Sequence, residues 1–121
     1  MILVDTSVWV DHLRKGEPVL ARLLEAGRVL AHPFIIGELA LGSLRNRSTV
    51  IGALRNLGAA TAASNEEVLA FIETQRLAGL GIGYIDAHLL ASTRLTPGTS
   101  FWTRDRRLHA VAERLSLAAR L

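Results

Sequence analysis

The feature that most constrains the fold is the alternation of short apolar runs with longer segments of helical pattern. Strands are expected at Ile2 to Val4, Arg28 to Ala31, Thr99 to Thr103 and, more weakly, Ala59 to Ala63. Between them, apolar residues recur at helical spacing. Such alternation favours an α/β fold with a parallel sheet and helices on both of its faces. The length fits a single domain, residues 1–121.

Prolines, glycines and capping residues mark where the helices should begin and end. The expected helices run from the Asp5 cap to Gly16, from Pro18 to Gly27, from Phe34 to about Leu44, from Val50 to Leu57, from Ser64 to Leu77, from Tyr84 to about Arg94 and from Asp105 to Leu115. Ser64 and Glu67 form a capping-box pattern at the start of the fifth of these. In that helix Val68, Leu69 and Ile72 are predicted to face inward.

Four acidic residues lie beside apolar stretches. Asp5 and Asp105 follow the first and last predicted strands, and Glu38 and Asp86 lie inside apolar helical segments. Because ligands of parallel sheets gather outside the carboxyl ends of the strands, we expect the four side chains to converge. Two buried carboxylates about 4 Å apart repel by roughly 4 kcal/mol at an effective dielectric constant near 20, so a cation should compensate them. Oxygen-only ligands favour Mg²⁺ or Mn²⁺, ions that also bind phosphate oxygens.

Each acidic residue also has an ordinary structural explanation. Asp5 and Asp105 could cap helices, and Asp105 could pair with the arginines beside it. Glu38 could be a surface residue at the edge of an apolar stripe. Asp86 could interact with the dipole at the start of its helix. The hypothesis of a metal site that hydrolyses phosphodiesters therefore depends on the coincidence of four placements.

The charge composition favours a polyanionic substrate. Thirteen of the 14 basic residues are arginine, and the net charge is +3. Arginine presents a planar fork of donors that matches phosphate, although a solvated basic surface without a partner is the alternative. The absence of cysteine excludes disulfides, thiolate nucleophiles and cysteine zinc sites. No basic leader and no apolar stretch of the ~20 residues that span a membrane is present, so we expect a soluble, cytoplasmic protein.

Four segments form a series in the chain, namely Ile2–Trp9, Ile35–Gly42, Gly83–Ala91 and Trp102–Leu108. In this order they resemble the PIN-domain ribonucleases and, within them, the VapC toxins of bacterial and archaeal toxin–antitoxin pairs. The resemblance spans nearly the whole chain. It implies a PIN-like fold, in which a central parallel sheet is flanked by helices on both faces.

The resemblance also implies an activity and a site. The implied reaction is endonucleolytic cleavage of RNA, supported by one or two Mg²⁺ or Mn²⁺ ions. Asp5, Asp86 and Asp105 would hold the metal, and Glu38 would either ligate it or orient the attacking water. None of these four positions is missing.

Further residues and partners follow from the same resemblance. Thr6 and Thr103 are implied as polar support for the site. The implied partners are RNA, a second copy of the chain in a homodimer, and a cognate antitoxin that buries an apolar groove between the N-terminal helices. Separately, Arg45, Arg47 and Arg104 are predicted to contact RNA.

Three other functions are considered. A PIN nuclease that matures RNA would use the same residues, and the sequence does not separate it from a toxin. A PIN-like module that binds RNA or protein without catalysis would be expected to lack some of the four acids. A phosphotransfer receiver domain is disfavoured, because no phosphoacceptor aspartate is recognisable and Lys15 is the sole lysine.

Overall fold

Four short strands form a single parallel sheet at the centre of the molecule. The computed structural model describes residues 1 to 121, and the strand order is β3-β2-β1-β4. The bounds are Ile2–Val4 for β1, Val29–Ala31 for β2, Gly58–Ala59 for β3 and Ser100–Trp102 for β4. The predicted parallel α/β architecture is confirmed, although β3 is shorter than the predicted strand.

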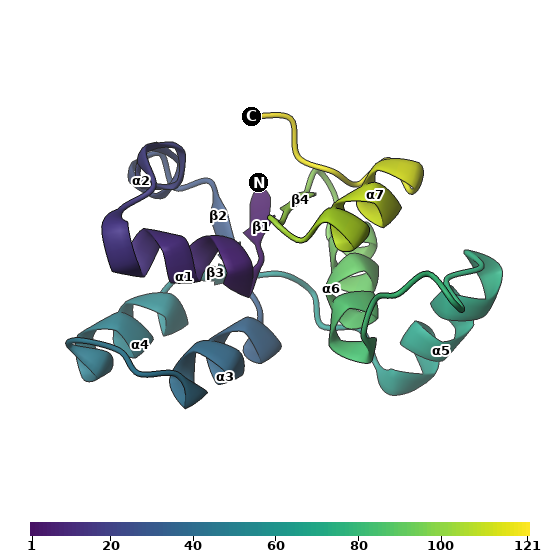
Figure 1. Cartoon of the computed structure of the whole chain (residues 1–121), viewed down its shortest axis with the longest axis horizontal. Helices are drawn as coiled ribbons and strands as arrows, with labels where there is room; N and C mark the ends of the chain where they lie inside the picture. The colour runs from purple at the N-terminus through teal and green to yellow at the C-terminus, as the bar shows by residue number, and fades with distance from the viewer.

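Seven helices connect and cover the strands. They are α1 (Thr6–Lys15), α2 (Pro18–Glu25), α3 (Pro33–Leu41), α4 (Arg47–Arg55), α5 (Asn65–Thr74), α6 (Tyr84–Leu95) and α7 (Arg106–Arg114). Helices α1 to α4 lie on one side of the sheet and α5 to α7 on the other (Figure 1). None of the helices combines the length and apolar character needed to cross a membrane.

Helix α3 is shorter than predicted. It ends at Leu41 instead of about Leu44, because Gly42 takes an extended backbone conformation with φ −84° and ψ 171°. Helix α4 then begins at Arg47, ahead of its predicted start at Val50. The boundary is therefore set by the backbone of one glycine, whereas the apolar pattern continues past it.

The neighbouring strands β1 and β4 bring residues from the two ends of the chain together. Leu3 and Val4 of β1 are fully buried, as is Phe101 of β4. The parallel register pairs Leu3 with Phe101 and Val4 with Trp102. The next residues in the chain, Asp5 and Thr103, consequently leave the sheet at the same level.

The C-terminal segment adds a backbone pairing that the sequence did not predict. The amide of Phe101 donates to the carbonyl of Leu117 (2.7 Å), and the amide of Ala119 donates to the carbonyl of Phe101 (2.8 Å). This segment runs parallel to β4 and forms an isolated bridge with it. It covers part of the outer edge of β4, which reduces the unpaired edge that could recruit another strand.

Helix α5 confirms its predicted cap but not its predicted inner face. The Ser64 hydroxyl accepts from the Glu67 amide (3.1 Å), and the Glu67 carboxylate accepts from the Ser64 amide (2.8 Å). Val68 is buried, whereas Leu69 is 57% exposed. The prediction for Leu69 is wrong because α5 packs on α6 through one face, which contains Val68 and Ile72.

A buried histidine joins α3 to α6. His32 precedes α3 and is 1% exposed. Its Nδ1 accepts from the amide of Phe34 (3.0 Å), so the neutral ring carries its proton on Nε2, which lies 3.1 Å from the Ser92 hydroxyl of α6. Burial, reinforced by the nearby imidazole of His88, lowers the pKa of His32 from 6.5 to about 4. This contact links the helices that carry Glu38 and Asp86.

The folded protein is therefore expected to lose stability in mild acid through His32. Its pKa is lower in the folded chain than in the unfolded chain, so its contribution is present above about pH 6.5 and is lost as the pH falls towards 4. The full shift corresponds to about 3 kcal/mol. Urea unfolding of the wild type and of His32→Asn, measured between these pH values, should give a shallower dependence in the variant. Equal slopes would show that another group titrates.

Candidate functional site

The site is built where β1 and β4 end. Asp5 follows β1 and is 7% exposed. One of its oxygens, Oδ2, accepts from the hydroxyls of Ser7 (2.7 Å) and Thr103 (2.8 Å). Asp5 occupies the N-cap position of α1 but makes no capping hydrogen bond through its side chain. The helix-cap alternative therefore does not account for this carboxylate.

Asp105 follows β4 and lies at the start of α7. Its Oδ1 accepts from the amide of Leu108 (2.9 Å), and its own amide donates to the hydroxyl of Thr103 (3.1 Å). It forms no ion pair with Arg104 or another arginine. The predicted capping role is confirmed, and Thr103 connects this residue to Asp5.

Glu38 reaches the site from α3. The hydroxyl of Thr6, which directly follows Asp5, donates to Glu38 Oε1 (2.7 Å). The side chain is exposed, and its neighbours on the helix, Phe34 and Leu41, are 37% and 91% exposed. Glu38 therefore lies on the surface although its segment is apolar, because this face of α3 points to solvent.

Asp86 lies in the first turn of α6 and is partly buried. Burial raises the pKa of its carboxyl, and the negative charges of Asp5, Asp105 and Glu38 raise it further. A hydrogen bond from the Gly83 amide (2.9 Å) opposes this rise. All three other predicted acids are therefore close enough to repel Asp86, as the metal hypothesis expects.

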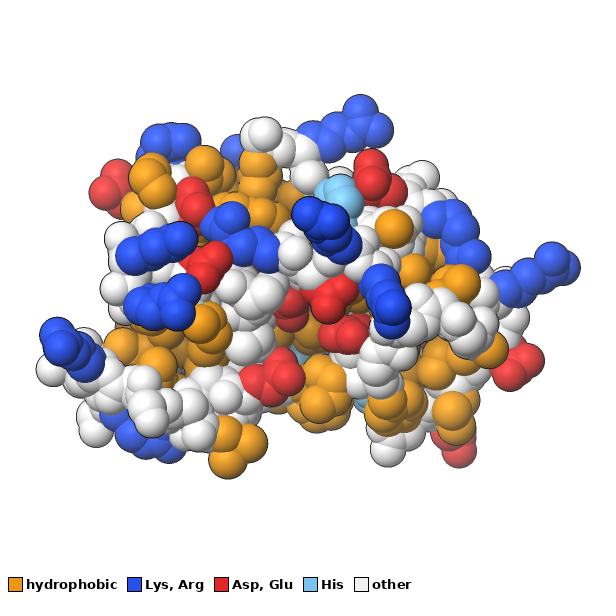
Figure 2. Space-filling model, in the orientation of Figure 1, with side chains coloured by type: hydrophobic (Ala, Val, Ile, Leu, Met, Phe, Trp, Pro, Cys, Tyr) orange, Lys and Arg blue, Asp and Glu red, His pale blue; other side chains and the backbone are white.

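The four carboxylates share one bonding pattern. In each, one oxygen is held by the protein and the other accepts no hydrogen bond. None of the four forms an ion pair with an arginine or lysine. Figure 2 shows acidic side chains gathered at the centre of one face, with basic side chains around them. The donor set is thus oxygen-rich and not neutralised, which suits a hard divalent cation.

The side chains do not form a closed set of ligands as they stand. No group of three or more His, Asp and Glu side chains is arranged to hold a single ion. Burial and, to a lesser extent, the charges of the other three acids raise the pKa of Asp86, so the uncompensated carboxylates disfavour one another's ionised form. The chemistry of the donors fits a metal, and the metal role of each residue remains a prediction.

Ser7 is a site residue that the sequence analysis did not single out. Its hydroxyl donates to Asp5, lies 3.3 Å from the Thr103 hydroxyl and accepts from the amide of Arg104 (3.0 Å). It therefore joins the two turns that follow β1 and β4. Its position two residues after a strand-ending aspartate is the signal that could have pointed towards this role.

The arginines predicted to bind RNA have different surroundings. Arg45 lines a cavity that Glu38 also lines, and Arg47 begins α4 on the surface. Neither makes an ion pair. Arg104 is instead paired with Asp11 and Glu17. Two of the three guanidinium groups are thus free for a ligand.

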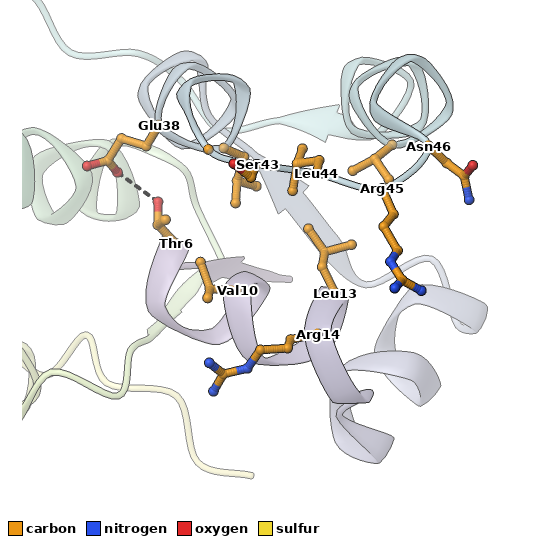
Figure 3. Close-up of a pocket in the computed structure, with 12 residues that line it drawn as sticks. Thr6, Val10, Leu13, Arg14, Glu38, Ser43, Leu44, Arg45 and Asn46 are labelled. Carbon is orange, nitrogen blue, oxygen red and sulfur yellow. Dashed lines mark hydrogen bonds between the residues drawn. The ribbon is translucent and has the colours of Figure 1, made fainter.

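The cavity is a groove of about 810 Å³ between α1 and the segment that links α3 to α4. Figure 3 shows Glu38 and Thr6 at one end, Arg45 and Asn46 at the other, and Val10 and Leu13 along the α1 side. Apolar and basic side chains therefore alternate along a groove that opens at the carboxylate site. This groove lies where a groove between the N-terminal helices was expected.

Comparison with known proteins adds two findings. The family model of the PIN domain matches residues 2–114. Ribonuclease VapC32 of Mycobacterium tuberculosis, from strains CDC 1551 / Oshkosh and ATCC 25618 / H37Rv, is 44% identical over 118 residues. The alignment covers 98% of this chain and 95% of the relative.

Proposed function

The chain belongs to the PIN-domain family and, within it, to the VapC ribonucleases, and on this premise we propose that it is the metal-dependent endoribonuclease toxin of a type II toxin–antitoxin pair. The observation that carries the metal dependence is the convergence of Asp5, Glu38, Asp86 and Asp105, each with an oxygen left free of hydrogen bonds. The proposed place of action is the cytoplasm, where RNA is available.

The proposed ligands are Asp5, Asp86 and Asp105. When bound, Mg²⁺ or Mn²⁺ supplies a Lewis acid that polarises the phosphate and makes water a stronger nucleophile. Ser7 and Thr103 fix the orientation of Asp5, and the Gly83 amide fixes that of Asp86. Because these anchors occupy one oxygen of each carboxylate, the free oxygen has a defined direction.

Glu38 is proposed to ligate the metal or to orient the attacking water. Its carboxylate is exposed and is held on one side by Thr6 alone. That arrangement leaves Oε2 accessible to a water molecule at the RNA backbone. Arg45 and Arg47 are proposed to bind phosphates of the same strand, because their guanidinium groups have no acidic partner.

The experiment that tests this function is cleavage of total RNA by the purified protein with Mg²⁺ or Mn²⁺, with EDTA, and with Asp5→Asn prepared in the same way. Discrete cuts that require the metal and Asp5 would support the proposal and identify the substrate. Absence of cutting by folded, partner-free protein would overturn it in favour of a module that binds without catalysis.

We further propose that the antitoxin occupies the groove between α1 and α3. Val10 and Leu13 offer apolar surface in it, and Arg14 and Arg45 offer positive charge, so an amphipathic peptide with acidic residues is the expected occupant. The end of the groove lies at Glu38, which explains how a bound peptide would block the site.

Val10→Asp tests this partner site. Val10 is 45% exposed and lines the groove, so the substitution should place an unpaired charge against the bound peptide. We expect the protein encoded by the neighbouring small gene to bind about tenfold more weakly or worse. Cleavage by the free variant should be unchanged. Calorimetry that gives equal affinities for both forms would remove the groove from the interface.

A homodimer is also proposed. Exposed apolar side chains lie on α3 and at the start of α6, and they include Phe34, Leu41, Tyr84 and Ile85. A helix that is apolar on its exposed as well as its buried face commonly packs in an assembly. Sedimentation of the wild type and of Leu41→Lys tests the surface, and a wild type that stays monomeric at every concentration contradicts it.

A further inference from the structure

We infer that Arg104 is a positioning residue, whose side chain clamps the turn carrying Thr103 and Asp105 onto α1 and thereby holds both residues at the carboxylate site. The inference rests on the proposed function, since it concerns the geometry of the same site. It assigns Arg104 a role within the protein in place of contact with RNA.

Arg104 would hold the turn between β4 and α7 against α1. Within it, Thr103 donates to Asp5 and accepts from the amide of Asp105. The backbone amide of Arg104 donates to the Ser7 hydroxyl of α1. A shift of this turn away from α1 would therefore disturb the anchor of Asp5 and the position of Asp105 together.

The side chain of Arg104 adds two contacts outside the turn. Its Nε lies 3.0 Å from Asp11 Oδ2 of α1, and its NH2 group pairs with Glu17 Oε2 at the start of α2. The guanidinium also lies over the ring of Trp102, 5.7 Å from its centroid. One side chain consequently ties the end of β4 to two helices on the opposite side of β1.

One of the two carboxylates that receive Arg104 is itself held in place. The second oxygen of Glu17 accepts from the amide of Val19 (3.2 Å) and so caps α2. The Val19 amide, followed by Arg104, keeps the pKa of the Glu17 carboxyl below its usual range. A single exposed ion pair contributes little, but a planar fork with two acceptors, one of them anchored, fixes a geometry.

The same contacts make Arg104 a poor phosphate ligand. Its positive charge faces two carboxylates, whereas Arg45 and Arg47 face none. A phosphate that bound Arg104 would have to approach those carboxylates or displace them. Electrostatic repulsion opposes both routes.

The test compares Arg104→Gln, Arg104→Lys, Asp11→Asn/Glu17→Gln and the combined triple variant with the wild type. Steady-state cleavage of one RNA at fixed Mg²⁺ gives kcat and KM. Amide hydrogen exchange of residues 104–108 in the metal-free protein gives a readout that does not depend on activity, with α5 as the internal reference. Arg120→Gln, which removes an exposed unpaired arginine, is the matched control.

A clamp predicts that Arg104→Gln and Asp11→Asn/Glu17→Gln each lower kcat about tenfold, with KM changed less than twofold. Tenfold is the lower end of the loss of activity that is usual when a residue that orients metal ligands is replaced. Amide exchange in residues 104–108 should be faster in both variants. The triple variant should have a kcat no lower than that of Arg104→Gln. Arg104→Lys should have a kcat between those of Arg104→Gln and the wild type, because lysine keeps the charge but lacks the planar fork.

Direct contact with RNA predicts opposite signs. Removing the two acids would then strengthen RNA binding, and Arg104→Gln would raise KM. That pattern, or unchanged kcat and exchange in the double variant, would overturn the inference. If the wild type cut no RNA, the proposed function would fail. Hydrogen exchange would still test the clamp separately. Faster exchange of residues 104–108 in the variants would support it, and slower or unchanged exchange would contradict it.

Discussion

Replacing Asp86 by asparagine is expected to abolish RNA cleavage and to stabilise the metal-free protein. Loss of a residue that only orients a metal ligand typically lowers affinity or activity 10- to 100-fold, so loss of a proposed ligand should lower cleavage by more than about 100-fold. The stability effect has the opposite sign. Burial and the charges of Asp5, Asp105 and Glu38 raise the pKa of Asp86, which means that its ionised form is disfavoured in the folded chain.

A neutral amide removes that disfavoured charge. Because Asp86 is partly exposed and its interactions are screened, the gain in free energy of unfolding should be at most about 1 kcal/mol. Cleavage assays and urea unfolding in EDTA measure the two effects. Glu73→Gln, which neutralises an exposed acid on α5, is the control and should change neither. Retained cleavage, or a variant less stable than the wild type, would contradict the assignment of Asp86.

Thr103→Val is expected to produce the second largest loss of activity. The Thr103 hydroxyl donates to Asp5 (2.8 Å) and accepts from the Asp105 amide (3.1 Å), so valine leaves that amide without a partner and leaves Asp5 Oδ2 with the Ser7 hydroxyl alone. Cleavage should fall about 10- to 100-fold. The free energy of unfolding should fall by about 1–3 kcal/mol, the usual penalty for orphaned polar groups.

Two variants separate the effect on the site from a general effect of removing a hydroxyl. Thr103→Ser keeps the hydroxyl and should retain most of the activity. Thr93→Val removes another buried hydroxyl, one that donates to the Leu89 carbonyl within α6, and should leave cleavage intact. If Thr103→Val cut RNA as fast as Thr93→Val, Thr103 would have no role in orienting Asp5.

Much of the fold was predictable because its elements carry local signals. The apolar runs that became β1 and β4, the glycine that ends α1 and the capping box of α5 all act within a few residues of the chain. The sequence carries no such signal for the pairing of Ala119 with Phe101. Three small or apolar residues form a strand-like contact here only because the edge of β4 lies beside them. Leu69 illustrates the same limit for burial, because its exposure depends on which face of α5 meets α6.

The positions of the four acids were predictable, but their surroundings were not. Asp5 and Asp105 follow strands, and that placement is visible in the sequence. The exposure of Glu38 depends on how α3 lies against α1 through Thr6, and the pairing of Arg104 joins residues far apart in the chain. Such long-range contacts are set by packing, so composition and periodicity do not reveal them.

The pairing of β1 with β4 has a consequence for the timing of synthesis. Asp5 leaves the ribosome well before Thr103, which orients it and is 98 residues further along the chain. A growing chain emerges at about 5–20 residues per second, so the N-terminal half is exposed for several seconds before its strand partner exists. The carboxylate site can therefore assemble only after β4 and Thr103 have been synthesised, so a nascent chain that still lacks them carries Asp5 without the residue that orients it.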